Sequence, residues 1–372
     1  MSTHRVGRNG ERREQVRRRG GRARYLLAAA LLPLALGVAA CGSSDDGASA
    51  SGGGGGGGGA AKAGVPTVNI AITASEMPVA VAADQGLFKG VNVKYQTVGF
   101  DAKTPIFLKD SSMPITELSP VEVAQEIAKG EDIQYFSTTT GLYFWNGIVV
   151  RAQDAGKYKT IADLKGKKIG QPGFATGTWG AFAGLSKSLY GLNAKTDFNL
   201  VTADPGALLG LLQAGKIDAA LTFAGQAATG LASPKFHLMA GLGPLWQQKT
   251  GQAPMVDGLV ARTSWLKQNP TIAKNIVAGV DAGVDWMIAH PQEFAKGGKY
   301  EKLAEDDGWL TDAPTTAEIV KLLKAGQWYA KSDLYTPAWI DSNYKFAALA
   351  LEATGDKVPT KAQLFAAPGA AQ

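Results

Sequence analysis

Residues 124–137, AQEIAKGEDIQYFS, and residues 209–223, LGLLQAGKIDAALTF, follow one pattern that decides the fold class. In each, a helical run ends at a glycine, Gly130 or Gly215, and an Asp and an Ile then lead into a short apolar segment. Glycine is a common helix stop, and a short apolar run after it is typical of a strand. Helices that lead directly into strands predict an α/β fold with largely parallel sheets. Because the pattern occurs twice, we expect two similar lobes.

Short apolar runs predict the remaining strands. Strands are expected at 67–73, 91–98, 133–138, 147–151, 167–171, 198–203, 217–223, 236–240 and 258–262. Between many of them lie helices with clear start and stop residues, such as the capping box of Ser119-Pro-Val-Glu122 and the Asp204-Pro205 pair. The last third is mostly helical, with helices expected at 269–288, at 315–330 after a Thr315-x-x-Glu318 capping box, and at 341–353.

Residues 22–41, RARYLLAAALLPLALGVAAC, predict an export signal. Arginines precede an apolar run that closes on small residues, which is the order of a secretory leader. The run is shorter than the roughly 20 residues of a membrane span, and Pro33 interrupts it. We therefore expect residues 1–40 to be a signal peptide. The Arg18-Arg19 pair leaves twin-arginine export open beside the general secretory route.

Val38-Ala-Ala-Cys41 resembles the lipobox of bacterial lipoproteins, in which the cysteine thiol is alkylated with a lipid and becomes the new N-terminus. Cys41 is the only cysteine, so it has no partner for an intramolecular disulfide. An ordinary cleaved signal with an incidental cysteine is the alternative. Residues 41–65 are then a lipidated Cys41 and a Gly/Ser-rich linker, which behaves as flexible coil. We expect a lipid-anchored protein outside the cytoplasmic membrane.

The charge balance argues against a nucleic-acid partner. Nine of the 38 basic residues and two of the 32 acidic ones precede Cys41, which leaves 29 basic and 30 acidic residues. Only two of those basic residues, Arg151 and Arg262, are arginines. A nearly neutral chain lacks the basic surface that phosphate backbones require.

Five segments in order resemble the solute-binding proteins of ABC importers, in the branch that takes up nitrate, sulfonates, taurine and thiamine precursors. In chain order the five segments are MPVAVAADQGLF, TIADLKGKKI, the loop from Pro172 to Thr178, LLQAGKIDA and WLKQNP. The resemblance spans about residues 66–300. It implies a two-lobed, type II periplasmic-binding-protein fold with a hinge and a helical C-terminal third. Residues 66–145 with 263–372 would form lobe 1, and residues 146–262 would form lobe 2.

In open α/β sheets, ligands lie beyond the carboxyl ends of strands, and the resemblance implies two such edges facing across a cleft. The loops at these edges nominate the candidate ligand-binding residues. They are Ser75, Glu76, Met77, Ser119, Thr139, Tyr143, Trp145, Asn146, Phe174, Thr176, Gly177, Thr178, Trp179, Phe223 and Gln226.

The loop from Gly173 to Trp179 carries the most specific chemistry. Thr176 or Thr178 occupies the N-cap position of a helix, whose free backbone N–H groups attract an anion. A capped helix with no ligand is the alternative. The aromatic rings near these loops could stack on a flat solute or only fill the core.

Two carboxylates, Glu76 and Glu117, favour the opposite charge, since a carboxylate in the cleft would repel an anion and could bind an amine. Either could instead face solvent. A guanidinium clamp on a sulfonate or carboxylate is available only from Arg151 or Arg262, and both follow strands as scaffold residues would.

The expected function is capture of a small organic solute, a sulfonate, a nitrate-like anion or a pyrimidine or aromatic nutrient, for an ABC permease and its ATPase. His237 and His290 lie in structural settings, and no cysteine, histidine and carboxylate cluster has metal-ligand spacing. We therefore expect no enzyme, no cofactor and no metal, and a monomer held to the membrane by its lipid. An exported enzyme on the same fold, or a ligand sensor, remains the alternative.

Overall fold

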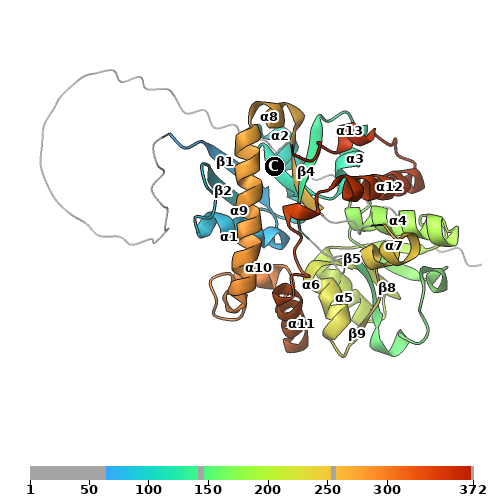
Figure 1. Ribbon diagram of the computed structural model, residues 1–372. Helices are drawn as coiled ribbons and strands as arrows, with labels where there is room; N and C mark the ends of the chain where they lie inside the picture. Colours follow the sequence, from blue (N-terminus) through green and yellow to red (C-terminus); the bar gives the residue numbers. More distant parts are fainter. Residues whose placement is uncertain (1–63, 141–145, 253–256, 370–372) are drawn as a thin grey trace, which may run out of the picture. The chain divides into compact units, whose positions relative to one another are not determined.

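The computed structural model describes residues 64–140, 146–252 and 257–369, and its strands form two five-stranded sheets (Figure 1). The first sheet has the strand order β2-β1-β3-β10-β4. Its strands are β1 (Thr67–Ile72), β2 (Asn92–Thr97), β3 (Ile115–Leu118), β4 (Ile133–Thr140) and β10 (Asp257–Arg262). Strand β1 is parallel to β2 and β3, whereas β10 is antiparallel to β3 and β4.

The second sheet repeats this plan in the order β7-β6-β8-β5-β9. Its strands are β5 (Asn146–Arg151), β6 (Lys168–Gln171), β7 (Asn199–Thr202), β8 (Ala219–Phe223) and β9 (Phe236–Gly241). Strand β5 is antiparallel to β8 and β9. Each sheet thus has a single antiparallel strand in its fourth place. The prediction of an α/β fold with largely parallel sheets is confirmed.

The chain crosses between the sheets twice. After β4 it enters the second sheet at β5, and after α7 (Leu242–Thr250) it returns to the first sheet as β10. Strand β10 therefore pairs in the first sheet, although the predicted second lobe of 146–262 includes it. The connecting residues 141–145 and 253–256 lie outside the described residues, as do the predicted signal peptide and Cys41.

Helices cover these sheets. The helices before the chain returns to the first sheet are α1 (Met77–Asp84), α2 (Phe100–Lys109), α3 (Pro120–Ala128), α4 (Gly177–Tyr190), α5 (Pro205–Gln213), α6 (Ala224–Ala232) and α7. Those after it are α8 (Thr263–Gln268), α9 (Pro270–Ala289), α10 (Glu301–Asp306), α11 (Ala313–Lys324), α12 (Pro337–Thr354) and α13 (Lys361–Leu364). No helix in the described part of the chain is both long and apolar enough to span a membrane.

Capping residues set the helix starts, and the starts of α11 and α12 differ from the prediction. Helix α12 begins at Pro337 after the Thr336 cap and not near residue 341. The Ser119 capping box and the Asp204 cap are present as predicted. The predicted Thr315 capping box is wrong, because α11 begins at Ala313 and Asp312 accepts the backbone N–H of Thr315 at 2.9 Å. The Asp312 carboxylate is the better cap, since it satisfies an unpaired N–H of the first turn and complements the helix dipole.

The C-terminal helices pack on the elements of both sheets. Helix α12 lies along α4 (Figure 1) and also contacts α3, and their side chains share one hydrophobic core. A Cβ atom on Gly184 of α4 would lie 3.1 Å from the backbone nitrogen of Ala350, so the two helices approach closely at this glycine. Helix α11 packs on α6, and side chains of both helices belong to one hydrophobic core.

Candidate functional site

A small cavity, the cleft cavity, lies where strand ends of the two sheets meet. Its volume is about 30 Å³. Elements of both sheets line it: Thr73, Ser75, Glu76, Phe100, Lys103, Glu122, Asn146, Thr176, Gly177, Thr178, Phe223 and Asp257. Antiparallel pairing explains two of these positions. The start of β5 at Asn146 lies beside the end of β8 at Phe223, and the start of β10 at Asp257 lies beside the end of β4.

A buried ion pair occupies the first-sheet side of the cavity. The Lys103 ammonium donates to Glu76 Oε1, and the other Glu76 oxygen accepts the backbone N–H of Thr73. Glu76 and Lys103 are 4% and 6% exposed. Burial acts to lower the pKa of Lys103, but the carboxylates of Glu76 and Glu122 outweigh it and raise that pKa above its ordinary value. The single ammonium of the cavity is therefore charged and already paired.

Glu122 belongs to the first turn of α3 and contacts the first turn of α4. Its Oε2 accepts the Ser119 backbone N–H at 3.0 Å and the Ser119 hydroxyl at 2.7 Å. A Cβ on Gly177 would lie 2.3 Å from Ser119 Oγ and 3.4 Å from Glu122 Oε2, so only glycine fits there without a shift. The Glu122 carboxylate thus lies at the N-terminus of α4, where the helix dipole favours negative charge.

The start of α4 is joined to β5 and capped from within. Thr176 Oγ accepts the backbone N–H of Trp179 at 3.1 Å and donates to the Gly173 carbonyl at 2.8 Å. Thr178 Oγ1 donates to Asn146 Oδ1 at 2.7 Å. The Glu122 carboxyl thus occupies the place beside this helix end where the sequence led us to expect a ligand, and burial raises its pKa against the opposing effects of Lys103 and the Ser119 hydrogen bonds.

Among the carboxylates that line the cleft cavity, Asp257 is the one without a partner in the described residues. No hydrogen bond or ion pair joins it to any other residue in the described ranges. Burial raises its pKa well above the usual range, the carboxylates of Glu122, Glu76 and Glu117 raise it further, and Lys103 opposes the shift. A negative charge on Asp257 is therefore costly while the cavity is empty.

A second, larger cavity of about 430 Å³ adjoins the first and shares Thr73, Ser75, Phe100 and Phe223 with it. Asp204, Asp306 and Asp307 also line it. Ser75 Oγ donates to Asp307 Oδ1 at 2.6 Å, and Trp309 Nε1 donates to Asp307 Oδ2 at 2.8 Å. Burial outweighs these two hydrogen bonds and raises the pKa of Asp307 to about 7.

The structure gathers about half of the predicted site residues. Seven line the cleft cavity: Ser75, Glu76, Asn146, Thr176, Gly177, Thr178 and Phe223. Gln226 lines the second cavity, and Ser119 borders the first through its contact with Gly177.

The remaining predicted residues lie elsewhere. Met77 and Trp179 are fully buried in hydrophobic cores, and Thr139 is buried in β4 without lining either cavity. Phe174 is 50% exposed and packs edge-on against Trp179 at 5.0 Å between ring centroids. Tyr143 and Trp145 lie outside the described residues.

Sequence reasoning missed Lys103 and Asp257 for identifiable reasons. Lys103 lies in α2, a helix that the sequence reading did not predict, and a lysine there resembles any exposed helical lysine. Asp257 precedes a strand, whereas the predicted site residues were those at the carboxyl ends of strands. Because β10 is antiparallel, its first residue reaches the same sheet edge. Glu117, the other carboxylate considered in the sequence analysis, is buried in β3 and lines neither cavity.

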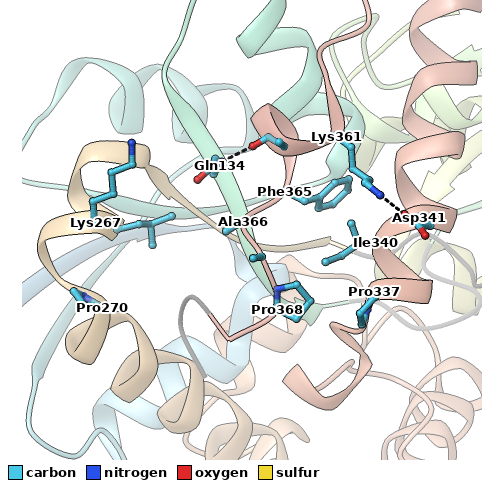
Figure 2. A pocket seen from close by; sticks show the side chains of 13 residues that line it. Gln134, Lys267, Pro270, Pro337, Ile340, Asp341, Lys361, Phe365, Ala366 and Pro368 are labelled. Carbon is cyan, nitrogen blue, oxygen red and sulfur yellow. Dashed lines mark hydrogen bonds and ion pairs between the residues drawn. The ribbon is translucent and has the colours of Figure 1, made fainter.

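Two larger cavities lie away from this site. One, of about 790 Å³, is lined by two predicted site residues, Phe174 and Trp179. The other, of about 590 Å³, lies among α8, α12 and α13 (Figure 2), and none of the predicted site residues lines it. Figure 2 shows its rim, where Lys361 pairs with Asp341 and Gln134 Nε2 donates to the Ala362 carbonyl at 2.7 Å. Its lining comes from helix ends and the C-terminal segment, so it does not combine residues from the edges of both sheets.

Two sheets with the same strand arrangement, whose strand ends line one cavity, define a periplasmic-binding-protein fold, and comparison with solved structures shows the same fold. The periplasmic aliphatic sulphonate binding protein SsuA from Escherichia coli is 14% identical with a TM-score of 0.61, over 80% of this chain and 94% of that one. The periplasmic nitrate-binding protein NrtA from Synechocystis PCC 6803 is 13% identical with a TM-score of 0.53, over 81% and 84%.

The sequence model of the NMT1/THI5-like family matches residues 73–294, and the chain belongs to that family. A Brucella abortus (strain 2308) protein, named only as a candidate binding protein, is 27% identical over 179 residues. The match covers 45% of this chain and 53% of that protein. The chain therefore spans about half the length of the curated relatives it matches.

Proposed function

We propose that this protein is the extracytoplasmic solute-binding component of an ABC importer, which captures a small organic solute and delivers it to a permease and its ATPase. The observation that carries the proposal is the cleft cavity, because residues from both sheets line it. The fold it shares with SsuA and NrtA, which their names describe as sulphonate- and nitrate-binding proteins, supports it. These neighbours are binding proteins, and we propose no catalytic step.

In this proposal each sheet is the framework of one lobe, and the solute holds the lobes together. The lobes follow the predicted boundaries, except that β10 joins the first. A ligand shifts a hinge equilibrium only by the contacts it makes in the closed state and not in the open one. Thr73 and Glu76 on one side and Asn146 and Thr178 on the other are placed to make such contacts. The small cavity volume corresponds to a closed arrangement of these edges.

Ligand binding is tested with the purified full chain by intrinsic tryptophan fluorescence and thermal unfolding, against sulfonates, nitrate, pyrimidines and amines. Native mass spectrometry of the same preparation identifies any co-purified solute. We expect one class to give a saturable response and to raise the melting temperature. A chain that responds to no compound and carries no co-purified solute would contradict the proposal.

The membrane anchor is a separate part of the proposal and rests on Cys41 and the residues before it. Cys41→Ser removes the thiol that lipid attachment requires. We expect the variant to be released into the soluble extracytoplasmic fraction, whereas the unaltered chain stays with the membrane and incorporates labelled fatty acid. Equal membrane association of both would refute the anchor and leave solute binding untouched.

A further inference from the structure

We propose that the solute is a small organic cation whose ammonium group occupies the cleft cavity against Asp257 and whose body extends into the second cavity. This rests on the proposed function and names the chemical class of its solute. It departs from the sulphonate and nitrate that the structural neighbours' names specify.

The first argument is the charge of the lining. Three carboxylates, those of Glu76, Glu122 and Asp257, face one ammonium, that of Lys103. Lys103 is bound to Glu76, so it cannot also serve as the counter-charge of an anionic solute without breaking a buried pair. An anion in the cavity would disfavour ionisation of Glu122 and Asp257 still further, whereas a cation would stabilise their charged forms.

The second argument is that no guanidinium is available to grip an anion. Arg151 donates from Nε to Asp154 at 2.6 Å, and Arg262 donates to the carbonyls of Phe107 and Leu108 at 2.8 and 2.9 Å. Neither lines the cleft cavity or the second cavity. The N-terminus of α4, the other group that attracts anions, already has the Glu122 carboxylate beside it.

The third argument is the unpartnered acceptors. Asp257 lines the cleft cavity and makes no hydrogen bond or ion pair with the rest of the described chain. The side-chain oxygen of Gln226, which lines the second cavity, is buried and accepts no hydrogen bond from a described residue. Buried polar groups normally have partners, so the Gln226 oxygen calls for a ligand with N–H donors, and the partly exposed Asp257 carboxyl is open to the same ligand. A positive charge beside Asp257 would also offset the burial that raises the pKa of its carboxyl.

The cavities set the size of the cation. About 30 Å³ holds one or two water-sized groups, which is enough for an ammonium head group and no more. The rings of Phe100 and Phe223, which pack on each other at 5.4 Å between centroids, line both cavities and place aromatic surface where the two cavities adjoin. The lining of the second cavity is also acidic, because it includes three aspartates and no lysine or arginine.

A metal ion fits these residues less well than an amine. The described part of the chain holds no group of three or more His, Cys, Asp or Glu side chains placed to coordinate a metal. The Glu76 oxygens are taken by Lys103 and by the Thr73 N–H, and Glu122 Oε2 caps α3. One open carboxylate beside aromatic rings suits an ammonium group better than a divalent ion, which requires several oxygen ligands.

The test compares methylammonium chloride with sodium methanesulfonate on the full chain, at matched ionic strength. Both probes have one carbon and opposite charge, and the ammonium group fits the cleft cavity. We expect methylammonium to raise the melting temperature saturably, by about 2–3 °C at ten times its dissociation constant, and methanesulfonate to leave it unchanged.

Asp257→Asn keeps the shape of the side chain and removes its charge, and should weaken methylammonium binding at least about tenfold. Circular dichroism verifies that this variant is folded. Asp341→Asn, at the rim of the separate cavity of Figure 2, is the matched control and should bind as the unaltered chain does.

The inference would be overturned by the absence of a saturable response to methylammonium, or by an equal response in Asp257→Asn. Binding of methanesulfonate, or of any anion in the broader panel, would overturn it while the solute-binding function stands. That function fails separately, only if the panel and the mass spectrometry reveal no solute of any charge.

Discussion

Asp307 makes the stability of this protein depend on pH in a direction opposite to that of most carboxylates. Its side chain is buried, and its pKa is raised from the usual 3.8 to about 7. The folded state therefore holds a proton that the unfolded chain has already released. The free energy of unfolding falls as pH rises from about 4 to about 7 and is then constant as far as this group is concerned. The difference between the two pKa values corresponds to at most about 4 kcal/mol of unfolding free energy.

Asp307→Asn isolates this contribution because the amide cannot titrate. Its nitrogen can donate to Ser75 Oγ, and its oxygen can still accept the Trp309 Nε1–H, so both hydrogen bonds of the protonated carboxyl are kept. We expect the variant to match the unaltered chain near pH 4. It should exceed it by as much as about 4 kcal/mol near pH 8.

The assay is urea unfolding followed by circular dichroism at several pH values between 4 and 8. Because other groups titrate in this range, the informative quantity is the difference between variant and unaltered chain. Asp306→Asn is the control, since that neighbouring side chain is 42% exposed and should change the free energy by less than about 1 kcal/mol throughout. A difference for Asp307→Asn that is constant with pH, or that falls as pH rises, refutes the reasoning.

Three further changes test separate contacts. Gly177→Ala places a Cβ against Ser119, so it should hold the sheet edges apart and weaken solute binding at least about tenfold. Gly210 has open space around it, so the control variant Gly210→Ala should bind normally in the same titration. Lys103→Met leaves a buried carboxylate unpaired and should cost about 3–5 kcal/mol in urea unfolding; a loss below 1 kcal/mol would show that the pair is unimportant. Asp312→Ala removes the cap of α11 and should lower the unfolding free energy by about 1 kcal/mol, which an unchanged urea midpoint would disprove.

The sequence predicted the periodic parts of this fold well. Segments that alternate helix, glycine stop and strand are local patterns, so β8 and the helix before it could be placed to within a few residues. The α12 start was misplaced because Pro337 and the Thr336 cap lie ahead of the residues that carry the apolar repeat. The α11 start was misplaced for a related reason, since Asp312 competes with Thr315 for the same cap position.

The candidate site was only half predictable, because its chemistry depends on long-range pairing. Ser75, Thr176 and Thr178 follow parallel strands, and the general rule for such sheets located them. Asp257 reaches the site only because β10 runs antiparallel, and no local pattern indicates strand direction. Lys103 is buried by a partner 27 residues away along the chain. The balance of charge in the cavity depends on both of these residues as well as on Glu76 and Glu122, so it could not be settled from the sequence.

The return of the chain to the first sheet as β10 fixes the order in which the two sheets can be completed. Strand β4 pairs only with β10 among the described strands, so the first sheet lacks one of its inner members until residue 262 has been synthesised. The chain is synthesised from its amino end, so the strands of the first sheet before residue 141 remain without β10 until a segment more than a hundred residues later has been made. A nascent chain stalled before residue 257 should therefore remain sensitive to protease across its first sheet, although every other strand of that sheet has already been made.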